Sequence, residues 1–275
     1  MRAALVGALA VVLVAVALYA VSRSRDVPSR GRPDQPHRTI RYGEGRDRFG
    51  ELWRPDGPGT VPVVVLIHGG FWREPYRLDL MDGLARDLSS RGFAAWNIEY
   101  RRVGGGGGFP ATFDDVAAAI DHLAAIASSE RLDLSRVVTV GHSAGGHLAL
   151  WAASRDNPAV EVTKAISLAG VPDLVEADRA HLGSDAAREL LGGSAAGVPD
   201  RYAAASPAAR LPLGVPQVLV HGADDDIVPP SFSRAYAAAA TAAGDDVELV
   251  ELPGVDHDDV IDPSSPAWTA VLDRL

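Results

Sequence analysis

The stretch Gly141-His142-Ser143-Ala144-Gly145 matches the pattern Gly-x-Ser-x-Gly and is the most informative part of the sequence. The branched residues at 136–140 predict a strand before it, and residues 144–154 predict a helix after it. A serine in such a tight strand-to-helix turn needs small neighbours and holds its hydroxyl exposed above the carboxyl end of a sheet. We therefore expect Ser143 to be a nucleophile.

Strands and helices alternate on both sides of this turn. Nearly continuous branched-apolar runs predict strands that are buried on both faces. The alternation predicts parallel βαβ units with right-handed crossovers and helices on both faces, so the expected fold class is α/β. The expected strands are 39–42, 49–53, 61–67, 93–98, 137–140, 165–168, 215–220 and 247–252, and the expected helices are 78–90, 114–127, 144–154, 231–243 and 267–275.

The segment from residue 172 to residue 214 breaks this alternation, because it is too long for a simple crossover. We expect it to form a small helical insertion over the site. Leu182, Leu190, Leu191 and Tyr202 could form a lid over a small apolar substrate, or they could merely bury the insertion itself. The sequence leaves these two interpretations open.

A serine hydroxyl is a weak nucleophile until a base takes its proton. His257 is the last histidine of the chain and directly follows the last expected strand, so a loop there can return its imidazole to Ser143. The acid that orients the histidine is expected after the strand 215–220, where Asp224, Asp225 and Asp226 lie side by side. Spacing alone does not choose among these three carboxylates.

Acyl transfer also needs amide donors for the developing oxyanion, and removal of one donor costs about 3–4 kcal/mol. One expected donor is the backbone N–H of Ala144, which follows the nucleophile. The other source is the loop after the strand 61–67, where Gly69, Gly70 and Phe71 occur in the stretch His-Gly-Gly-Phe-Trp. Glycines there allow the backbone to approach a substrate closely.

Taken together, the His68-Gly-Gly-x-Trp loop, the Gly-His-Ser-Ala-Gly-Gly turn at Ser143, the His221-Gly-x-x-Asp-x-x-Val-Pro stretch and the late His257 resemble one group of α/β-hydrolases. This group includes feruloyl-esterase-like esterases and kynurenine formamidases, and the resemblance covers the chain from about residue 39 onward. It implies the α/β-hydrolase fold, with a mostly parallel eight-stranded sheet and the insertion before the acid-bearing strand. It also implies Asp225 as the acid. Phe71 stands where formamidases often carry tyrosine.

The activity implied by this resemblance is hydrolysis of a carboxylic ester of a small substrate, through an acyl-enzyme on Ser143. No cofactor and no metal are expected. An arylformamidase acting on an amide and a small-peptide serine peptidase are the enzymatic alternatives. A non-catalytic binding module on the same fold is the alternative outside enzymes. The complete set of Ser143, Asp225 and His257 favours an enzyme.

Composition narrows the class of partner. The 275 residues are 47% hydrophobic, which suits one domain with a sizeable core. The formal net charge of -10 repels phosphate backbones and argues against nucleic acid as a partner. The chain has no cysteine, which excludes disulfides and a cysteine nucleophile.

The first 38 residues differ from the rest. Residues 3–21 form an apolar run without a charge, close to the ~20 residues that span a bilayer as a helix. We expect residues 1–22 to be a single-span membrane anchor, residues 23–38 a Pro- and Arg-rich linker, and residues 39–275 the catalytic domain. The side of the membrane stays open, although the arginines after the span would place that domain in the cytoplasm by the positive-inside rule. A cleaved signal peptide, with secretion, and a misplaced start codon are alternatives.

Overall fold

The computed structural model describes residues 37–275. The expected membrane span, residues 1–22, and most of the expected linker lie outside the described residues. Among the helices of residues 37–275, none is long and apolar enough to cross a membrane. The first described strand begins at His37, two residues before the expected start of the catalytic domain.

The described residues form one eight-stranded sheet in the order β1-β2-β4-β3-β5-β6-β7-β8. β2 pairs antiparallel with β1 and β4, and all other neighbouring strands are parallel. This topology confirms the predicted α/β-hydrolase fold. The strands are β1 (His37–Arg41), β2 (Phe49–Trp53), β3 (Val61–Ile67), β4 (Ala94–Ile98), β5 (Leu132–His142), β6 (Lys164–Leu168), β7 (Gln217–Gly222) and β8 (Val247–Leu252).

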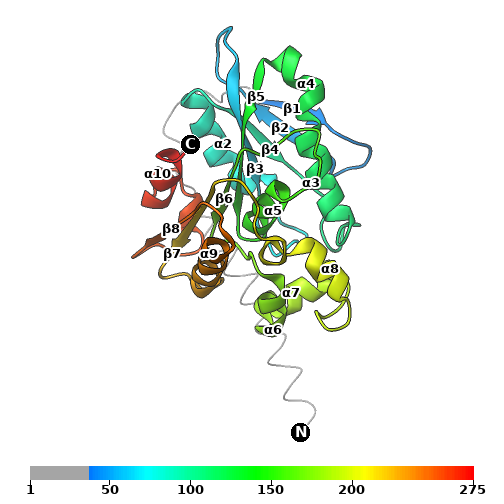
Figure 1. Cartoon of the computed structure of the whole chain (residues 1–275). Coiled ribbons are helices and arrows are strands. Elements are labelled where there is room, and N and C mark those ends of the chain that lie inside the picture. Colours follow the sequence, from blue (N-terminus) through cyan, green and yellow to red (C-terminus); the bar gives the residue numbers. More distant parts are fainter. Residues whose placement is uncertain (1–36) are drawn as a thin grey trace, which may run out of the picture. The chain divides into compact units, whose positions relative to one another are not determined.

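Helices cover both faces of the sheet (Figure 1). In β3 the side chains of Val63, Val65 and Ile67 pack toward α3 and α5, whereas Val64 and Leu66 pack toward α2 and α10. All five side chains are fully buried, as expected for a strand with period-2 alternation between two covered faces. The covering helices are α2 (Asp82–Ser90), α3 (Ala111–Asp121), α4 (Leu123–Glu130), α5 (Ala144–Ala153), α9 (Ser231–Ala243) and α10 (Pro266–Leu272).

Several elements differ from their predicted bounds, and two of these differences have a local reason. The helix expected at 114–127 is two helices, α3 and α4, with a break at His122, whose carbonyl accepts from Ala125 at the tighter i+3 spacing. β5 begins at Leu132 rather than near residue 137, because its polar first half still pairs with the start of β3 across a register shift. Neither difference moves the turn at Ser143.

The predicted helical insertion lies between β6 and β7 and gathers at one end of the molecule (Figure 1). Leu190, Leu191 and Tyr202 are at most 2% exposed and belong to the main core cluster, and Leu182 packs against it. These residues therefore bury the insertion and do not form an apolar lid surface. The insertion comprises α6 (Leu174–Arg179), α7 (Leu182–Leu191), α8 (Pro199–Ala205) and the short helix η2 (Pro207–Arg210).

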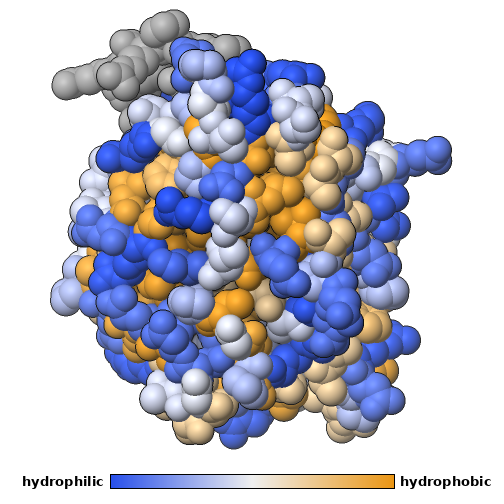
Figure 2. Space-filling model, turned by 45° about the horizontal axis from the view of Figure 1, so that its top comes forward, coloured by the Kyte–Doolittle hydropathy of each residue, from blue (hydrophilic) through white to orange (hydrophobic). Residues whose placement is uncertain are grey.

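On the side drawn in Figure 2, hydrophobic areas are interrupted by hydrophilic side chains. Leu80 and Val175 are the exposed large hydrophobic residues within residues 37–275. Single exposed residues of this kind are normal on protein surfaces and do not by themselves mark a binding face.

Candidate active site

Ser143 lies in the turn between β5 and α5, with φ 55° and ψ -118°. This conformation is unfavourable for a residue with a side chain, at about 1–3 kcal/mol, and such strain concentrates at functional sites. The turn is held by the Ser143 amide, which donates to the Leu168 carbonyl of β6 at 2.8 Å. A methyl group on Gly145 would lie only 2.0 Å from the Ile67 carbonyl oxygen, so glycine is required there. The predicted strand-turn-helix context of Ser143 is confirmed.

Asp225 and His257 come together from the loops that follow β7 and β8. Asp225 Oδ2 lies 2.7 Å from His257 Nδ1, so the ring donates its Nδ1 proton to the carboxylate. The other carboxylate oxygen accepts from the amides of Ile227 and Val228 at 2.9 and 2.8 Å. These bonds fix the carboxylate and leave Nε2 of His257 as the basic nitrogen.

The structure distinguishes Asp225 from its two neighbours. Asp225 is 6% exposed, whereas Asp224 and Asp226 are exposed to solvent. Burial opposes ionisation of Asp225, but hydrogen bonds from His221 and His257 outweigh it and hold the pKa of this carboxyl well below its usual range. Asp225 is therefore the carboxylate placed to orient His257.

His221 is a second histidine on Asp225 that sequence reasoning did not assign. Its Nε2 lies 3.1 Å from Asp225 Oδ2 and 2.9 Å from the Val228 carbonyl, and both are acceptors. Nε2 must therefore carry the proton, and Nδ1 accepts from the Ser233 hydroxyl at 2.7 Å. The i to i+4 spacing of His221 and Asp225 within one motif was the available signal.

His142 connects the serine turn to the loop of His257. Its Nε2 donates to the His257 carbonyl at 2.9 Å, and the two ring centroids are 4.7 Å apart. Burial and the nearby His257 lower the pKa of His142 to about 3, so the ring is neutral. Across residues 37–275 no hydrogen bond joins Ser143 Oγ to His257, a contact that is often long or poorly aligned before substrate binds.

The expected oxyanion loop follows β3 and has an unusual backbone. Gly70, Phe71 and Trp72 have φ of 106°, 52° and 57°, a left-handed run in which two bulky residues take part. The loop lies directly beside the nucleophile, since a methyl group on Gly69 would be 3.0 Å from Ser143 Cβ. On the other side of the site, Ala144 is the first residue of α5, where amides lack an intrahelical partner.

Buried charges support the base of this loop. His68 Nε2 lies 2.9 Å from Glu99 Oε1, and the His68 carbonyl accepts from the Tyr100 hydroxyl at 2.8 Å. Arg102 pairs with Glu99 and lies 3.3 Å from Asp47. Burial opposes ionisation of Glu99, but its bonds to His68 and Arg102 lower its pKa. A paired charge network of this kind is costly to break by removing one member.

Trp72 links the loop to helix α5 and to the insertion. Its Nε1 donates to His147 Nδ1 at 3.2 Å, and His147 Nε2 donates to the Ala205 carbonyl at 2.9 Å. Burial lowers the pKa of His147 to about 4, so the ring stays neutral in this bridge. His142 and His147 thus have structural partners, and no metal-binding group of side chains is found among the described residues.

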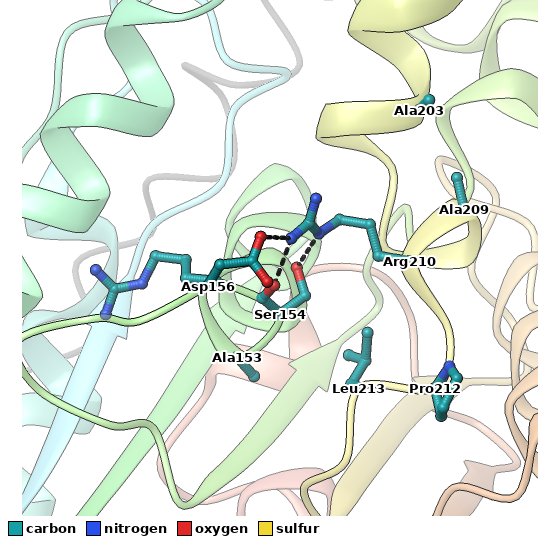
Figure 3. A pocket seen from close by; sticks show the side chains of 9 residues that line it. Ala153, Ser154, Asp156, Ala203, Ala209, Arg210, Pro212 and Leu213 are labelled. Atoms are coloured by element: carbon teal, nitrogen blue, oxygen red, sulfur yellow. Dashed lines mark hydrogen bonds and ion pairs between the residues drawn. The ribbon is translucent and has the colours of Figure 1, made fainter.

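Two hollows, of about 370 and 450 Å³, lie at the far end of α5 from Ser143 and share Arg155, Asp156 and Arg210 in their walls. In the first, the Arg210 guanidinium is held by Ser154 and Asp156 (Figure 3). A ten-residue helix is about 15 Å long, so this hollow is remote from the nucleophile. Neither hollow is lined by Ser143, Asp225 or His257.

Comparisons with known proteins identify the family of the chain. Residues 52–239 match the BD-FAE family. Esterase LipQ of Mycobacterium tuberculosis is 31% identical over 240 residues, which cover 79% of this chain and 56% of that protein. Kynurenine formamidase of Drosophila melanogaster is 26% identical over 144 residues, covering 50% of this chain and 46% of that protein. The chain thus spans about half the length of these curated relatives.

Among solved structures, the phosphonate-inhibited esterase B from Lactobacillus rhamnosis superposes with a TM-score of 0.81. It covers 97% of this chain and 92% of that chain at 21% identity, a level that supports the fold. The match to residues 52–239 spans more than half of the chain. The chain therefore belongs to the BD-FAE family, within the esterase and lipase group of α/β-hydrolases, as its motifs indicated.

Proposed function

We propose that the protein hydrolyses carboxylic esters of small substrates through an acyl-enzyme on Ser143. The observation that carries this proposal is the Asp225–His257 pair at 2.7 Å beside the strained turn that carries Ser143. A carboxylate with a lowered pKa stabilises the imidazolium that forms when His257 takes a proton. The relationship to esterase LipQ is further support.

In the first half-reaction, His257 Nε2 removes the Ser143 proton while the hydroxyl oxygen attacks the substrate carbonyl. The oxyanion that develops is placed between the amide of Ala144 and the loop of Gly70 and Phe71. His257 then returns the proton to the leaving alkoxide. In the second half-reaction His257 activates a water, which attacks the acyl group and releases the acid.

An arylformamide is the second candidate substrate, supported by the similarity to a kynurenine formamidase. Formamide hydrolysis would use the same serine, base and amide donors as ester hydrolysis. Phe71, at the position where formamidases often carry tyrosine, gives the formamide no added support. The ester remains the first choice because the relative of higher identity is an esterase.

A fluorophosphonate probe and two substrate types test this proposal. We expect the wild-type protein to be labelled, and to turn over p-nitrophenyl esters with a preference for short acyl chains over long ones. N-formylkynurenine is expected to react more slowly than the best ester. Turnover of the formamide alone would replace the ester assignment, and a wild-type protein that neither labels nor hydrolyses either substrate would contradict a serine hydrolase.

We also propose, from the sequence alone, that residues 1–22 anchor the protein in a membrane, with secretion after cleavage as the alternative. The support is the uncharged apolar run at 3–21, whose length suits a bilayer span. N-terminal sequencing of the native protein tests this. An intact N-terminus in the membrane fraction is expected, and a mature chain that starts at or after Leu18 contradicts the anchor.

A further inference from the structure

One arginine of the oxyanion loop bonds directly to the helical insertion. The Arg73 guanidinium donates from Nε to Glu189 Oε2 at 2.6 Å, from Nη1 to the Gly183 carbonyl at 2.7 Å and from Nη2 to the Ser184 carbonyl at 2.9 Å. All three acceptors belong to the insertion. One side chain thus joins residues that are more than a hundred positions apart in the sequence.

The segment that accepts these bonds has a specialised backbone. Gly183, Ser184 and Asp185 have φ of 59°, 56° and 66°, a run of three left-handed residues at the start of α7. Side-chain-bearing residues adopt this conformation rarely and singly, so such a run needs external contacts to persist. The planar fork of an arginine suits it, because its N–H groups can bond two neighbouring carbonyls at once.

The aromatic ring of Phe71 rests on the same turn. A methyl group added to Gly183 would lie 2.3 Å from Phe71 Cε1, so the ring packs directly on the glycine backbone. Phe71 and Trp72 are themselves left-handed, and their backbone also depends on neighbours. Two unfavourable segments, one in the loop and one in the insertion, therefore support each other through Arg73 and Phe71.

The opposite side of the loop has its own attachment. The Val103 amide donates to the Trp72 carbonyl at 2.8 Å, and the Glu74 amide donates to the Val103 carbonyl at 3.1 Å. These backbone bonds do not involve the Arg73 side chain. Loss of the guanidinium should therefore leave the loop folded while it releases the Phe71 side, where the oxyanion donor is expected.

We propose that Arg73 is a positioning residue, which uses the left-handed turn of the insertion to hold the Phe71 amide where the oxyanion forms. The inference rests on the proposed serine hydrolase function. Arg73 acts on the reaction through the Phe71 backbone and contacts no reacting atom itself. The insertion then supports the oxyanion hole in addition to packing on the hydrophobic core.

The test compares Arg73→Met, which keeps the stem and removes the guanidinium, with Arg73→Lys and Gly183→Ala. Arg179→Met is the matched control, because Arg179 forms an exposed ion pair with Glu176 in the same insertion. Each full-length variant is assayed for kcat and KM with p-nitrophenyl acetate and for inhibition by a trifluoromethyl ketone, whose serine adduct carries an oxyanion. Circular dichroism and the melting temperature report whether each variant is folded.

For Arg73→Met and Gly183→Ala we expect kcat to fall at least about tenfold, because small displacements of a catalytic group are this costly. Ketone inhibition should weaken in parallel, KM should change less than twofold, and Arg179→Met should match the wild type. The kcat of Arg73→Lys should lie between those of Arg73→Met and the wild type, since one ammonium cannot reach both carbonyls.

A folded Arg73→Met protein with kcat within twofold of the wild type would overturn the inference. So would a higher KM with kcat and ketone inhibition unchanged, which would indicate substrate binding. If Arg73→Met does not fold, the inference is tested on Arg73→Lys, and a folded Arg73→Lys protein with kcat within twofold of the wild type would overturn it. An inactive and unlabelled wild type would instead contradict the proposed function, so the two failures are distinguishable.

Discussion

Replacing Ser143 by alanine is expected to reduce ester hydrolysis by roughly 10⁴–10⁶-fold, to the level left by binding and oxyanion donors. The hydroxyl is the proposed nucleophile, and no other serine stands at a strand-to-helix turn beside the Asp225–His257 pair in the described part of the chain. Labelling by the fluorophosphonate probe should disappear with the activity. Steady-state rates and gel fluorescence measure both.

Ser135→Ala is the control for this substitution. Ser135 is exposed and its hydroxyl bonds only to Asp133 near the start of β5, so labelling and turnover should equal those of the wild type. The Ser143→Ala protein should remain folded, because the Ser143 amide bond to β6 does not involve its side chain. Labelling of Ser143→Ala at the wild-type rate would disprove the assignment of the nucleophile.

The Asp225→Asn variant is expected to lose about 10⁴-fold in kcat, the size of effect known when an amide replaces the acid of such a triad. The amide cannot stabilise the imidazolium, and it can hold His257 in the wrong tautomer. KM should change little, since Asp225 is placed to contact His257 and not the substrate. Initial rates at neutral pH over a range of ester concentrations measure both constants.

Asp224→Asn provides a neighbour-matched control and should retain activity within about twofold, as surface substitutions usually have small effects. Equal losses in the two variants would contradict the choice of Asp225.

The stability of the folded protein should also depend on pH through Asp225. Because the pKa of Asp225 is lowered on folding, its ionised form stabilises the protein above about pH 4, and this contribution is lost as the pH falls. The melting-temperature gap between wild type and Asp225→Asn should therefore narrow on acidification.

Much of the sheet could be predicted because short runs of branched and aromatic residues between turn residues have a strong strand signal. β2, β3 and β8 were expected at their observed bounds, and α9 also matches. Each is a branched, aromatic or alanine-rich run bounded by turn residues. The start of β5 was missed because Asp133, Ser135 and Arg136 interrupt the apolar pattern, although the backbone there still pairs with β3. Whether a segment forms a strand depends also on the strand it pairs with, and the local composition of the segment does not reveal this partner.

The candidate site was predictable in part. Ser143 and His257 follow from local context and chain order, whereas Asp225 was chosen by resemblance. In the folded chain its burial and its hydrogen bond to His257 distinguish it from Asp224 and Asp226. The supports of the site were not predictable. The bond of Arg73 to Glu189 joins residues 116 positions apart. The left-handed backbone of Phe71 and Trp72 could not be predicted either, since neither residue type favours this conformation.

The strand order has a consequence for how activity would be lost on heating. Ser143 follows β5 near the middle of the sheet, whereas His257 follows β8, the edge strand, in which one residue is exposed and the other five are only partly buried. Local opening costs least free energy where burial is lowest, so sheet margins exchange and fray before the interior does. The nucleophile thus follows a buried central strand, whereas its base follows the strand at the edge of the sheet. On heating, we expect His257 to move away from Ser143 by local opening of this edge, and activity to be lost before the protein unfolds cooperatively.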